Sequence, residues 1–150
     1  MIKFHEGEFD EIGVSSGYLN SNGDTIIPAE KYYYCYTDTI RNFGIVMENK
    51  TGKLLGIDQN GTELYEIFKY DNGPDYLKSG LFRIIKNGKI GYANSNGKII
   101  IEPKFDCAYQ FKGEYALVSD NCETIKEGEN FIWKSEKWYQ ITTDGKRVEK

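Results

Sequence analysis

The sequence predicts an all-β protein built from antiparallel β-hairpins and meanders, and three observations support this fold class. No segment shows a helical apolar period over the length expected of a helix. Aromatic residues make up 15% of the chain, including 12 tyrosines and 8 phenylalanines, a composition that suits rings packed across short strands. Short apolar runs also alternate with Asn-Gly and Asp-Gly turns. We therefore expect strands and turns throughout.

One stretch, residues 91–106, supplies the motif that the rest of the chain repeats. It places the turn Ser95-Asn96-Gly97 between two apolar runs, and residues 17–23 match residues 91–97 at six of seven positions. Asn-Gly suits a tight hairpin because both residues tolerate the positive φ of a type I′ turn. We expect four such hairpin turns, carrying Asn-Gly or Asp-Gly, at Gly23, Gly61, Gly97 and Gly145.

The four turns predict a single domain, residues 1–150, of about four β repeats. Their spacings are 38, 36 and 48 residues, and the last is longer because an insert follows Ser119. Each repeat is predicted to be a small antiparallel meander. One meander buries little apolar surface, so neighbouring repeats must stack to form a core. The sequence leaves open whether the repeats form an open array or curl into a barrel.

The expected strands follow in chain order, each ended by a turn signal. In the first half, segment 9–14 has an acidic face, the strand 24–27 ends at Pro28, and segment 31–36 is the tyrosine run. Segments 43–48, 53–58 and 62–68 come next, separated by Thr51-Gly52 and Asn60-Gly61.

In the second half, segments 81–86 and 89–93 form a hairpin around Asn87-Gly88. The β-branched segment 98–102 follows and is expected to stop at Pro103, because proline has no N–H for the sheet ladder. Segment 120–130 lacks the repeat signature and is expected to be a long loop or a short helix. The last hairpin is expected to join segments 131–133 and 138–141 around residues 134–137.

The repeated pattern resembles the WG-repeat (KWG-repeat) family of bacterial proteins. Its unit resembles residues 89–111, from Lys89-Ile90-Gly91-Tyr92 through Gly97-Lys98 and Pro103 to Phe111, with Ile90 where the family has tryptophan. The last repeat keeps Trp138 but has Tyr139 in place of glycine. The resemblance covers most of the chain and implies stacked β repeats. It implies no catalytic residues.

Charge and composition exclude several classes of protein. A net charge of −4 and a pI of about 5.1 argue against nucleic-acid binding. The first residues are charged, so we expect no secretory signal, and no run is long enough to span a bilayer. Three cysteines without metal spacing favour reduced thiols in a cytoplasmic protein. Cys35 and Cys107 are expected in the core, and Cys122 is expected to be the exposed thiol.

No constellation in the sequence predicts catalysis, a metal site or a cofactor. His5 is the only histidine, and a surface position is the expected one. The glutamates at positions 6, 8, 127 and 129 cluster in sequence alone and are expected to be solvated. Asp58-Gln59-Asn60-Gly61 has residues found in calcium loops but lacks the downstream glutamate and the helices. We expect a protein without enzymatic activity.

Aromatic residues are the candidates for a binding surface. Strand alternation is expected to place Tyr32, Tyr34 and Tyr36 on one face, with Tyr33 and Cys35 on the other. Three phenols on one face leave many hydroxyl groups to satisfy, which favours exposure. The binding residues predicted from the sequence are Tyr32, Tyr34, Tyr36, Trp133 and Trp138.

These observations favour a non-enzymatic protein that uses a β-repeat surface to bind another protein. A sharper form of this hypothesis is an immunity or antitoxin-type protein that neutralises a toxin domain, because an acidic domain is attracted to a basic partner. The alternative is a carbohydrate or cell-wall binding module, in which tyrosine and tryptophan rings stack on sugar faces. An enzyme would require a concave pocket with converging carboxylates.

Overall fold

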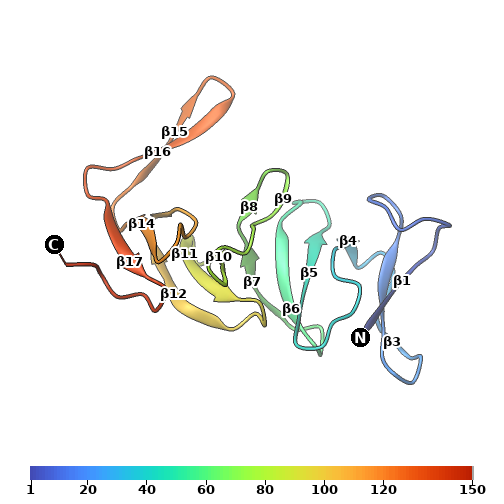
Figure 1. Cartoon of the computed structure of the whole chain (residues 1–150). Coiled ribbons are helices and arrows are strands. Elements are labelled where there is room, and N and C mark those ends of the chain that lie inside the picture. The colour runs from blue at the N-terminus through green and yellow to red at the C-terminus, as the bar shows by residue number, and fades with distance from the viewer. Residues whose placement is uncertain (150) are drawn as a thin grey trace. The chain divides into compact units, whose positions relative to one another are not determined.

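A computed structural model describes residues 1–149, and across these residues the chain forms strands and turns without a helix (Figure 1). The hairpins and meanders are antiparallel. The all-β fold class predicted from the sequence is therefore confirmed. The chain divides into two compact units, Met1–Pro74 (unit 1) and Asp75–Lys150 (unit 2).

Unit 1 contains a three-stranded sheet, a meander and a short hairpin. The first sheet has the strand order β1-β2-β3, and the meander β5-β6-β7 carries β4 beside β5. Its strands are β1 (Ile2–His5), β2 (Ser16–Leu19), β3 (Thr25–Ile27), β4 (Tyr32–Cys35), β5 (Phe43–Glu48), β6 (Leu54–Asp58), β7 (Glu63–Ile67), β8 (Lys69–Tyr70) and β9 (Gly73–Pro74). Tyr18, Ile27, Tyr32, Cys35 and Val46 lie in one buried cluster.

Unit 2 contains the meander β10-β11-β12, the sheet β13-β14-β17 and the separate hairpin β15-β16. Its strands are β10 (Leu81–Lys86), β11 (Lys89–Asn94), β12 (Ile99–Phe105), β13 (Cys107–Ala108), β14 (Tyr115–Ser119), β15 (Glu123–Glu127), β16 (Asn130–Lys134) and β17 (Tyr139–Thr142). The rings of Tyr92 and Phe111 meet edge to face with centroids 4.9 Å apart, and Tyr92 also contacts Phe105.

The repeated turns have a different geometry from the type I′ turn that the sequence predicted. Gly97 has φ of 81°, but Asn96 stays at negative φ, so this is a three-residue loop made of a type I turn followed by a left-handed glycine. The Asn94 side chain fixes it, because its Oδ1 accepts hydrogen bonds from the backbone N–H groups of Asn96 (3.0 Å) and Lys98 (3.1 Å). A type I′ turn occurs instead at Asn87-Gly88, where both φ angles are positive.

The same turn recurs at the other three predicted positions. The Oδ1 atoms of Asn20 and Asp58 each accept two backbone N–H bonds, as Asn94 does. In the last turn the Oγ1 atom of Thr142 accepts one from Lys146. The side chain three positions before each glycine therefore stabilises the turn by accepting backbone N–H bonds, and the Asn-Gly or Asp-Gly pair alone does not indicate this role.

Strand β12 continues through Pro103, so the expectation that this proline ends the strand is wrong. β12 lies at the edge of the meander β10-β11-β12, where proline is tolerated. The register against β11 shifts between the pairs Ile90↔Phe105 and Tyr92↔Ile101. Gly91 makes this possible, because a Cβ there would lie 2.6 Å from the nitrogen of Pro103 and 2.5 Å from the carbonyl oxygen of Ile101.

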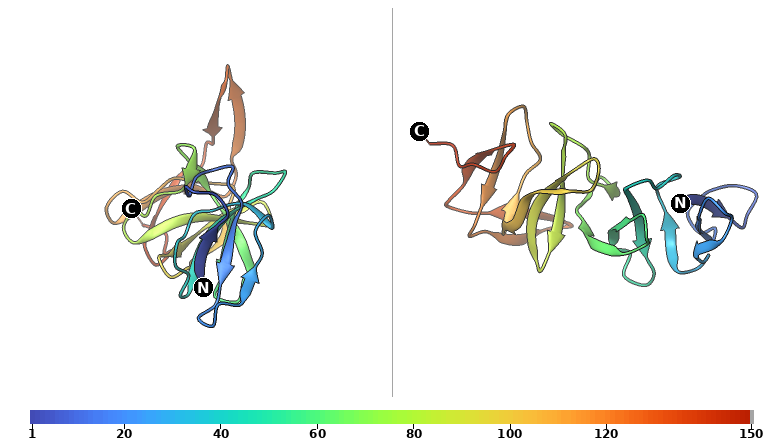
Figure 2. Two further views of the ribbon diagram at one scale, coloured as in Figure 1. Left: turned by 90° about the vertical axis from the view of Figure 1, so that its right-hand side faces the viewer. Right: turned by 90° about the horizontal axis from the view of Figure 1, so that it is seen from below.

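Three other expectations about elements are wrong. Residues 9–14 form no strand, and the first strand is β1. The segment expected as a loop or short helix contains β15, which pairs with β16. Residues 131–133 therefore do not form a hairpin with residues 138–141, because β17 pairs with β14. Pairing of the insert with itself leaves β17 free to complete the sheet of the last repeat, and Figure 2 shows β15-β16 projecting away from that sheet.

Candidate functional site

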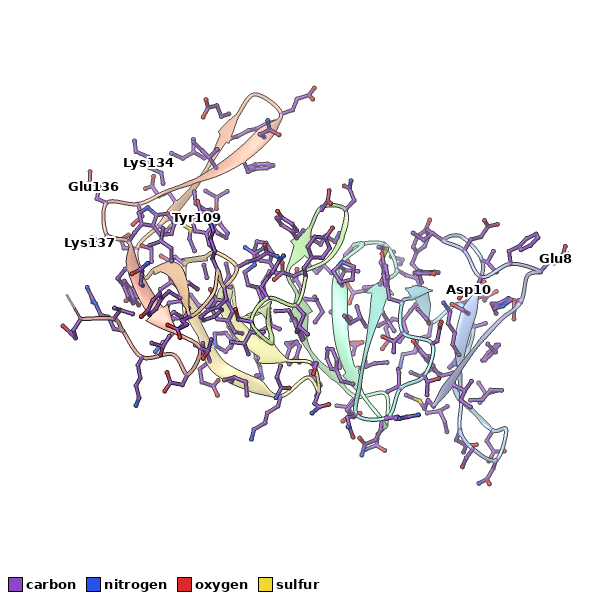
Figure 3. The ribbon with its side chains drawn as sticks, viewed as in Figure 1. Glu8, Asp10, Tyr109, Lys134, Glu136 and Lys137 are labelled. Atoms are coloured by element: carbon purple, nitrogen blue, oxygen red, sulfur yellow. A yellow bond between two sulfur atoms is a disulfide. The ribbon has the colours of Figure 1, made fainter. Side chains whose placement is uncertain are left out.

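Two predicted binding residues of unit 2, Trp133 and Trp138, meet around a third aromatic side chain, Tyr109. The ring centroid of Tyr109 lies 5.1 Å from that of Trp133 and 5.3 Å from that of Trp138. Trp133 comes from β16, Trp138 directly precedes β17, and Tyr109 directly follows β13. Tyr109 is 43% exposed, so the cluster reaches the surface (Figure 3). We call these three residues the aromatic cluster.

A buried ion pair fixes the backbone on both sides of Tyr109. The Asp75 carboxylate accepts hydrogen bonds from Nε (3.0 Å) and Nη2 (2.9 Å) of Arg83, and from the side-chain amide of Gln110 (2.8 Å). Arg83 also donates from Nη1 to the carbonyl oxygen of Ala108 at 3.0 Å. Both side chains of the pair are almost fully buried. Buried charges of this kind are stable when their hydrogen bonds are satisfied, so the pair holds residues 108–110 in place.

Asp75, Arg83 and Tyr109 are not among the binding residues predicted from the sequence. One signal was available, because Arg83 stands in the middle of an otherwise apolar strand and a charge in such a strand requires a buried partner. The partner, Asp75, lies between β9 and β10, outside every segment expected to be a strand. Tyr109 follows β13, and nothing in its neighbouring residues distinguishes it from a tyrosine of the core.

A disulfide anchors the insert beside the aromatic cluster. It joins Cys107, which is buried on β13, to Cys122, which directly precedes β15. The expectation of reduced thiols is therefore wrong for these two cysteines, which the fold brings within 5.9 Å between Cα atoms. Cys35 is free and buried, as expected.

Two serines close the base of the hairpin next to the disulfide. The hydroxyl groups of Ser119 and Ser135 lie 2.7 Å apart, and both donate to the carbonyl oxygen of Asn121. Asp106 adds a further link, because its carboxylate accepts a hydrogen bond from the Cys122 N–H at 3.3 Å and forms an ion pair with Lys89. These contacts hold the pKa of the Asp106 carboxyl below its usual value, chiefly through the hydrogen bond from Lys89.

The hairpin β15-β16 itself leaves apolar side chains in solvent. Phe131 is 68% exposed and Ile132 is 44% exposed. Phe131 pairs with Lys126 on the face that also carries Trp133, whereas Ile132 pairs with Ile125 on the other face. Each face of the hairpin therefore presents an apolar side chain. In Figure 1 the hairpin stands clear of β14 and β17.

A hollow of about 260 Å³ lies beside Trp138, at the foot of the hairpin. The Tyr139 hydroxyl donates to Oδ1 of Asp120 at 2.7 Å, and the Arg147 guanidinium lies 4.4 Å from the centroid of the Tyr139 ring. Burial, followed by the hydrogen bond to Asp120, raises the pKa of Tyr139 to about 12. The residues that line the hollow are Asp120, Asn121, Lys137, Trp138, Tyr139 and Arg147.

The tyrosine run of unit 1 does not form one face. A register shift lies between Tyr32 and Tyr34 in the pairing of β4 with β5, and a bulge of this kind interrupts side-chain alternation. Tyr32 is buried at 3% exposure in the same cluster as Cys35 and donates a hydrogen bond to Oε2 of Glu63 at 3.1 Å. Tyr32 is therefore a core residue.

Tyr34 and Tyr36 remain partly exposed and lie next to each other. Their rings meet edge to face with centroids 4.8 Å apart, and Nζ of Lys3 lies 4.3 Å from the Tyr34 ring centroid. Lys3 is itself held by an ion pair with Asp10 at 2.7 Å. Two rings meet here, compared with three in the aromatic cluster of unit 2, and the Lys3 ammonium group is already paired with Asp10.

The described residues hold no group that suits a bound metal. Among residues 1–149 there is no set of three or more histidine, cysteine, aspartate or glutamate side chains arranged to hold an ion. His5 is exposed, and its Nδ1 lies 2.7 Å from the carbonyl oxygen of Gly7. No helix in this part of the chain is long and apolar enough to cross a membrane.

Comparison with known proteins gives one match. The family model of the WG-containing repeat matches residues 90–121, which run from β11 through β12, β13 and β14 to the base of the insert. No curated protein and no solved structure matches the chain. The matched segment contains Tyr109 and the close approach of Gly91 to Pro103. The chain therefore carries a WG-containing repeat, the family that the motif around Gly97 had indicated.

Proposed function

We propose that this chain is a non-enzymatic binding protein that holds a protein partner through the β surface of unit 2. The observation that carries the proposal is the hairpin β15-β16, which exposes Phe131 and Ile132 on its two faces. Large apolar side chains that stay exposed to solvent on a projecting element mark interaction surfaces. The hairpin is small, and a lone two-stranded ribbon is marginally stable in water.

The contacts at the base of the hairpin support this proposal. The Cys107–Cys122 disulfide and the Ser119–Ser135 contact restrict the hairpin before any partner arrives. Restricting a binding element in advance lowers the entropy that association costs. The aromatic cluster, to which β16 contributes Trp133, supplies tyrosine and tryptophan, residue types that are enriched among those dominating binding energy at interfaces.

A finer form of the proposal is that the partner is a toxin domain with a basic surface, bound in the manner of an immunity protein. The net charge of −4 and three glutamates on and around the hairpin, Glu123, Glu127 and Glu129, favour a cationic partner. The cytoplasmic location expected from the sequence stays a prediction. A disulfide favours an oxidising compartment instead, and alkylation of thiols in freshly lysed cells distinguishes the two.

Two matched phenylalanines test the proposal. Phe131 of the hairpin is 68% exposed and Phe9 of unit 1 is 66% exposed, so the variants Phe131→Asp and Phe9→Asp change the same side chain at equal exposure. In affinity capture from the native host, we expect a stoichiometric protein partner with the wild type and with Phe9→Asp, and loss of that partner with Phe131→Asp.

The test has two outcomes that contradict the proposal. One is capture of no stoichiometric partner by the wild type. The other is equal retention by the two variants, which would place the contact outside the hairpin. Because both substitutions are at exposed positions, we expect unchanged thermal unfolding, and this measurement separates loss of binding from loss of fold.

A further inference from the structure

We propose that the hollow beside Trp138 binds a carboxylated saccharide, a ligand class separate from the protein partner proposed above. The hollow lies wholly within unit 2 and is formed by the segments on either side of the hairpin together with the residue at position 147. It combines one indole ring with side chains that donate and accept hydrogen bonds. A sugar ring presents the matching combination, an apolar C–H face and a rim of hydroxyl groups.

Two further hollows adjoin this one through shared lining residues, and we call the three together the groove. A second hollow, of about 220 Å³, shares Asn121 and Lys137 with it and continues toward Lys134 and Glu136 (Figure 3). A third, of about 630 Å³, shares Trp138 and continues along β17 toward Val148. A groove with several adjoining subsites suits an oligomeric ligand rather than a single small molecule.

The charges in the central hollow favour a ligand with a carboxylate. The side chains that line it carry two positive charges, on Lys137 and Arg147, and one negative charge, on Asp120. One oxygen of that carboxylate already accepts the Tyr139 hydroxyl, and the other is available to a sugar hydroxyl group. The Arg147 guanidinium lies over the Tyr139 ring at 4.4 Å, which orients its planar fork. A guanidinium fork binds a carboxylate through two parallel hydrogen bonds.

The backbone at this groove argues against an extended peptide as the ligand. Peptides that add to a sheet need a strand edge with free N–H and C=O groups. The outer edge of β17 is already occupied by residues 146–148. Thr142 donates its N–H to the carbonyl oxygen of Lys146, and Val148 donates to that of Gln140, both at 2.9 Å. Recognition at this groove therefore falls to side chains.

Calorimetric titration of the whole chain with trigalacturonate tests the proposal, with maltotriose as the neutral sugar and triglutamate as the acidic peptide. We expect binding of trigalacturonate alone. Arg147→Gln removes the guanidinium fork and is expected to weaken this binding about tenfold or more, as loss of a charge-assisted contact does. Lys146→Gln is the matched control, because it makes the same charge change at the neighbouring residue, which is outside the groove. The control is expected to bind as the wild type does.

A second measurement does not depend on any variant. The indole N–H resonance of Trp138 in the wild type is expected to shift on addition of trigalacturonate and to stay in place with maltotriose. Four results would overturn the proposal: no heat and no shift with trigalacturonate, equal binding of maltotriose, equal binding of triglutamate, or equal losses in Arg147→Gln and Lys146→Gln. Neither hairpin substitution at Phe131 nor partner capture enters this test, so the two proposals succeed or fail separately.

Discussion

The hairpins β10-β11 and β15-β16 of unit 2 have the same pairing pattern but differ in whether other elements pack against them. Both are antiparallel with an unbroken register. The first is covered by β12 and by the repeat core, so Ile84 and Ile90 are buried, whereas the second has no third strand and exposes Phe131 and Ile132. Apolar content therefore does not decide burial. Burial depends on the neighbouring elements, and the repeat supplies neighbouring strands for β10-β11 but none for β15-β16.

The largest expected difference between the two hairpins is in stability. Ile84 on β10 is fully buried and Ile132 on β16 is 44% exposed. We expect Ile84→Ala to lower the free energy of unfolding by about 2–5 kcal/mol, because it leaves a cavity in the core. Ile132→Ala is expected to change it by about 0.5 kcal/mol or less. Urea unfolding measures both, and equal losses would show that β15-β16 packs as part of the core.

Removing the disulfide tests how the exposed hairpin is held. The bond joins residues 15 apart in sequence, and closing a loop of this length stabilises a chain by up to about 3 kcal/mol. In the double variant Cys107→Ala, Cys122→Ser we expect loss of up to this amount. In this variant the rate of backbone hydrogen exchange is expected to increase more in β15-β16 than in β10-β11. The wild type treated with a reductant is the control, and uniform exchange across both hairpins would contradict this account.

The smallest expected effect is at Asp106, which connects the repeat to the insert through Lys89 and the Cys122 N–H. Its pKa in the folded state lies below the ordinary 3.8. A lowered carboxyl pKa contributes stability that is present above pH 3.8 and is lost as the pH falls through the folded value. The carboxylate is partly exposed, so the contribution is about 1 kcal/mol or less.

Asp106→Asn is therefore expected to flatten the dependence of unfolding free energy on pH in the acid range below 3.8. Unfolding free energies of the wild type and variant measured across that range check this prediction. Asp24 is the matched control position, because it is an exposed aspartate without an ion pair among the described residues. An unchanged slope in Asp106→Asn would show that the ionised carboxylate of Asp106, paired chiefly with Lys89, does not stabilise the fold.

Local signals were sufficient for the strands of the repeat. Segments 43–48 and 81–86 were predicted with the bounds that β5 and β10 have, because alternation and the flanking turn residues act within a few positions. The same reasoning failed at Pro103, where Gly91 on the neighbouring strand allows the chain to continue. It placed the turn at Gly97 correctly but gave the wrong turn type, since Asn94 fixes the backbone from three residues before Gly97.

The candidate site could be predicted only in part. Trp133 and Trp138 were identified from the sequence, because large aromatic side chains are enriched at binding surfaces. Their contact with Tyr109 depends on Asp75 and Arg83 holding residues 108–110, a long-range arrangement without a sequence pattern. Tyr32 was assigned to a surface because strict alternation was assumed, and the register shift in β4 places it in the core.

The sequence alone determined the all-β fold class and the repeated motif that resembles the WG-containing repeat, because turn residues and strand alternation are properties of consecutive positions. Tertiary structure alone decided that Cys107 and Cys122 form a disulfide and that Phe131 and Ile132 of the insert stay exposed. These features depend on which distant segments become neighbours. Which distant segments become neighbours depends on the free energy of the whole fold, and no short segment determines it.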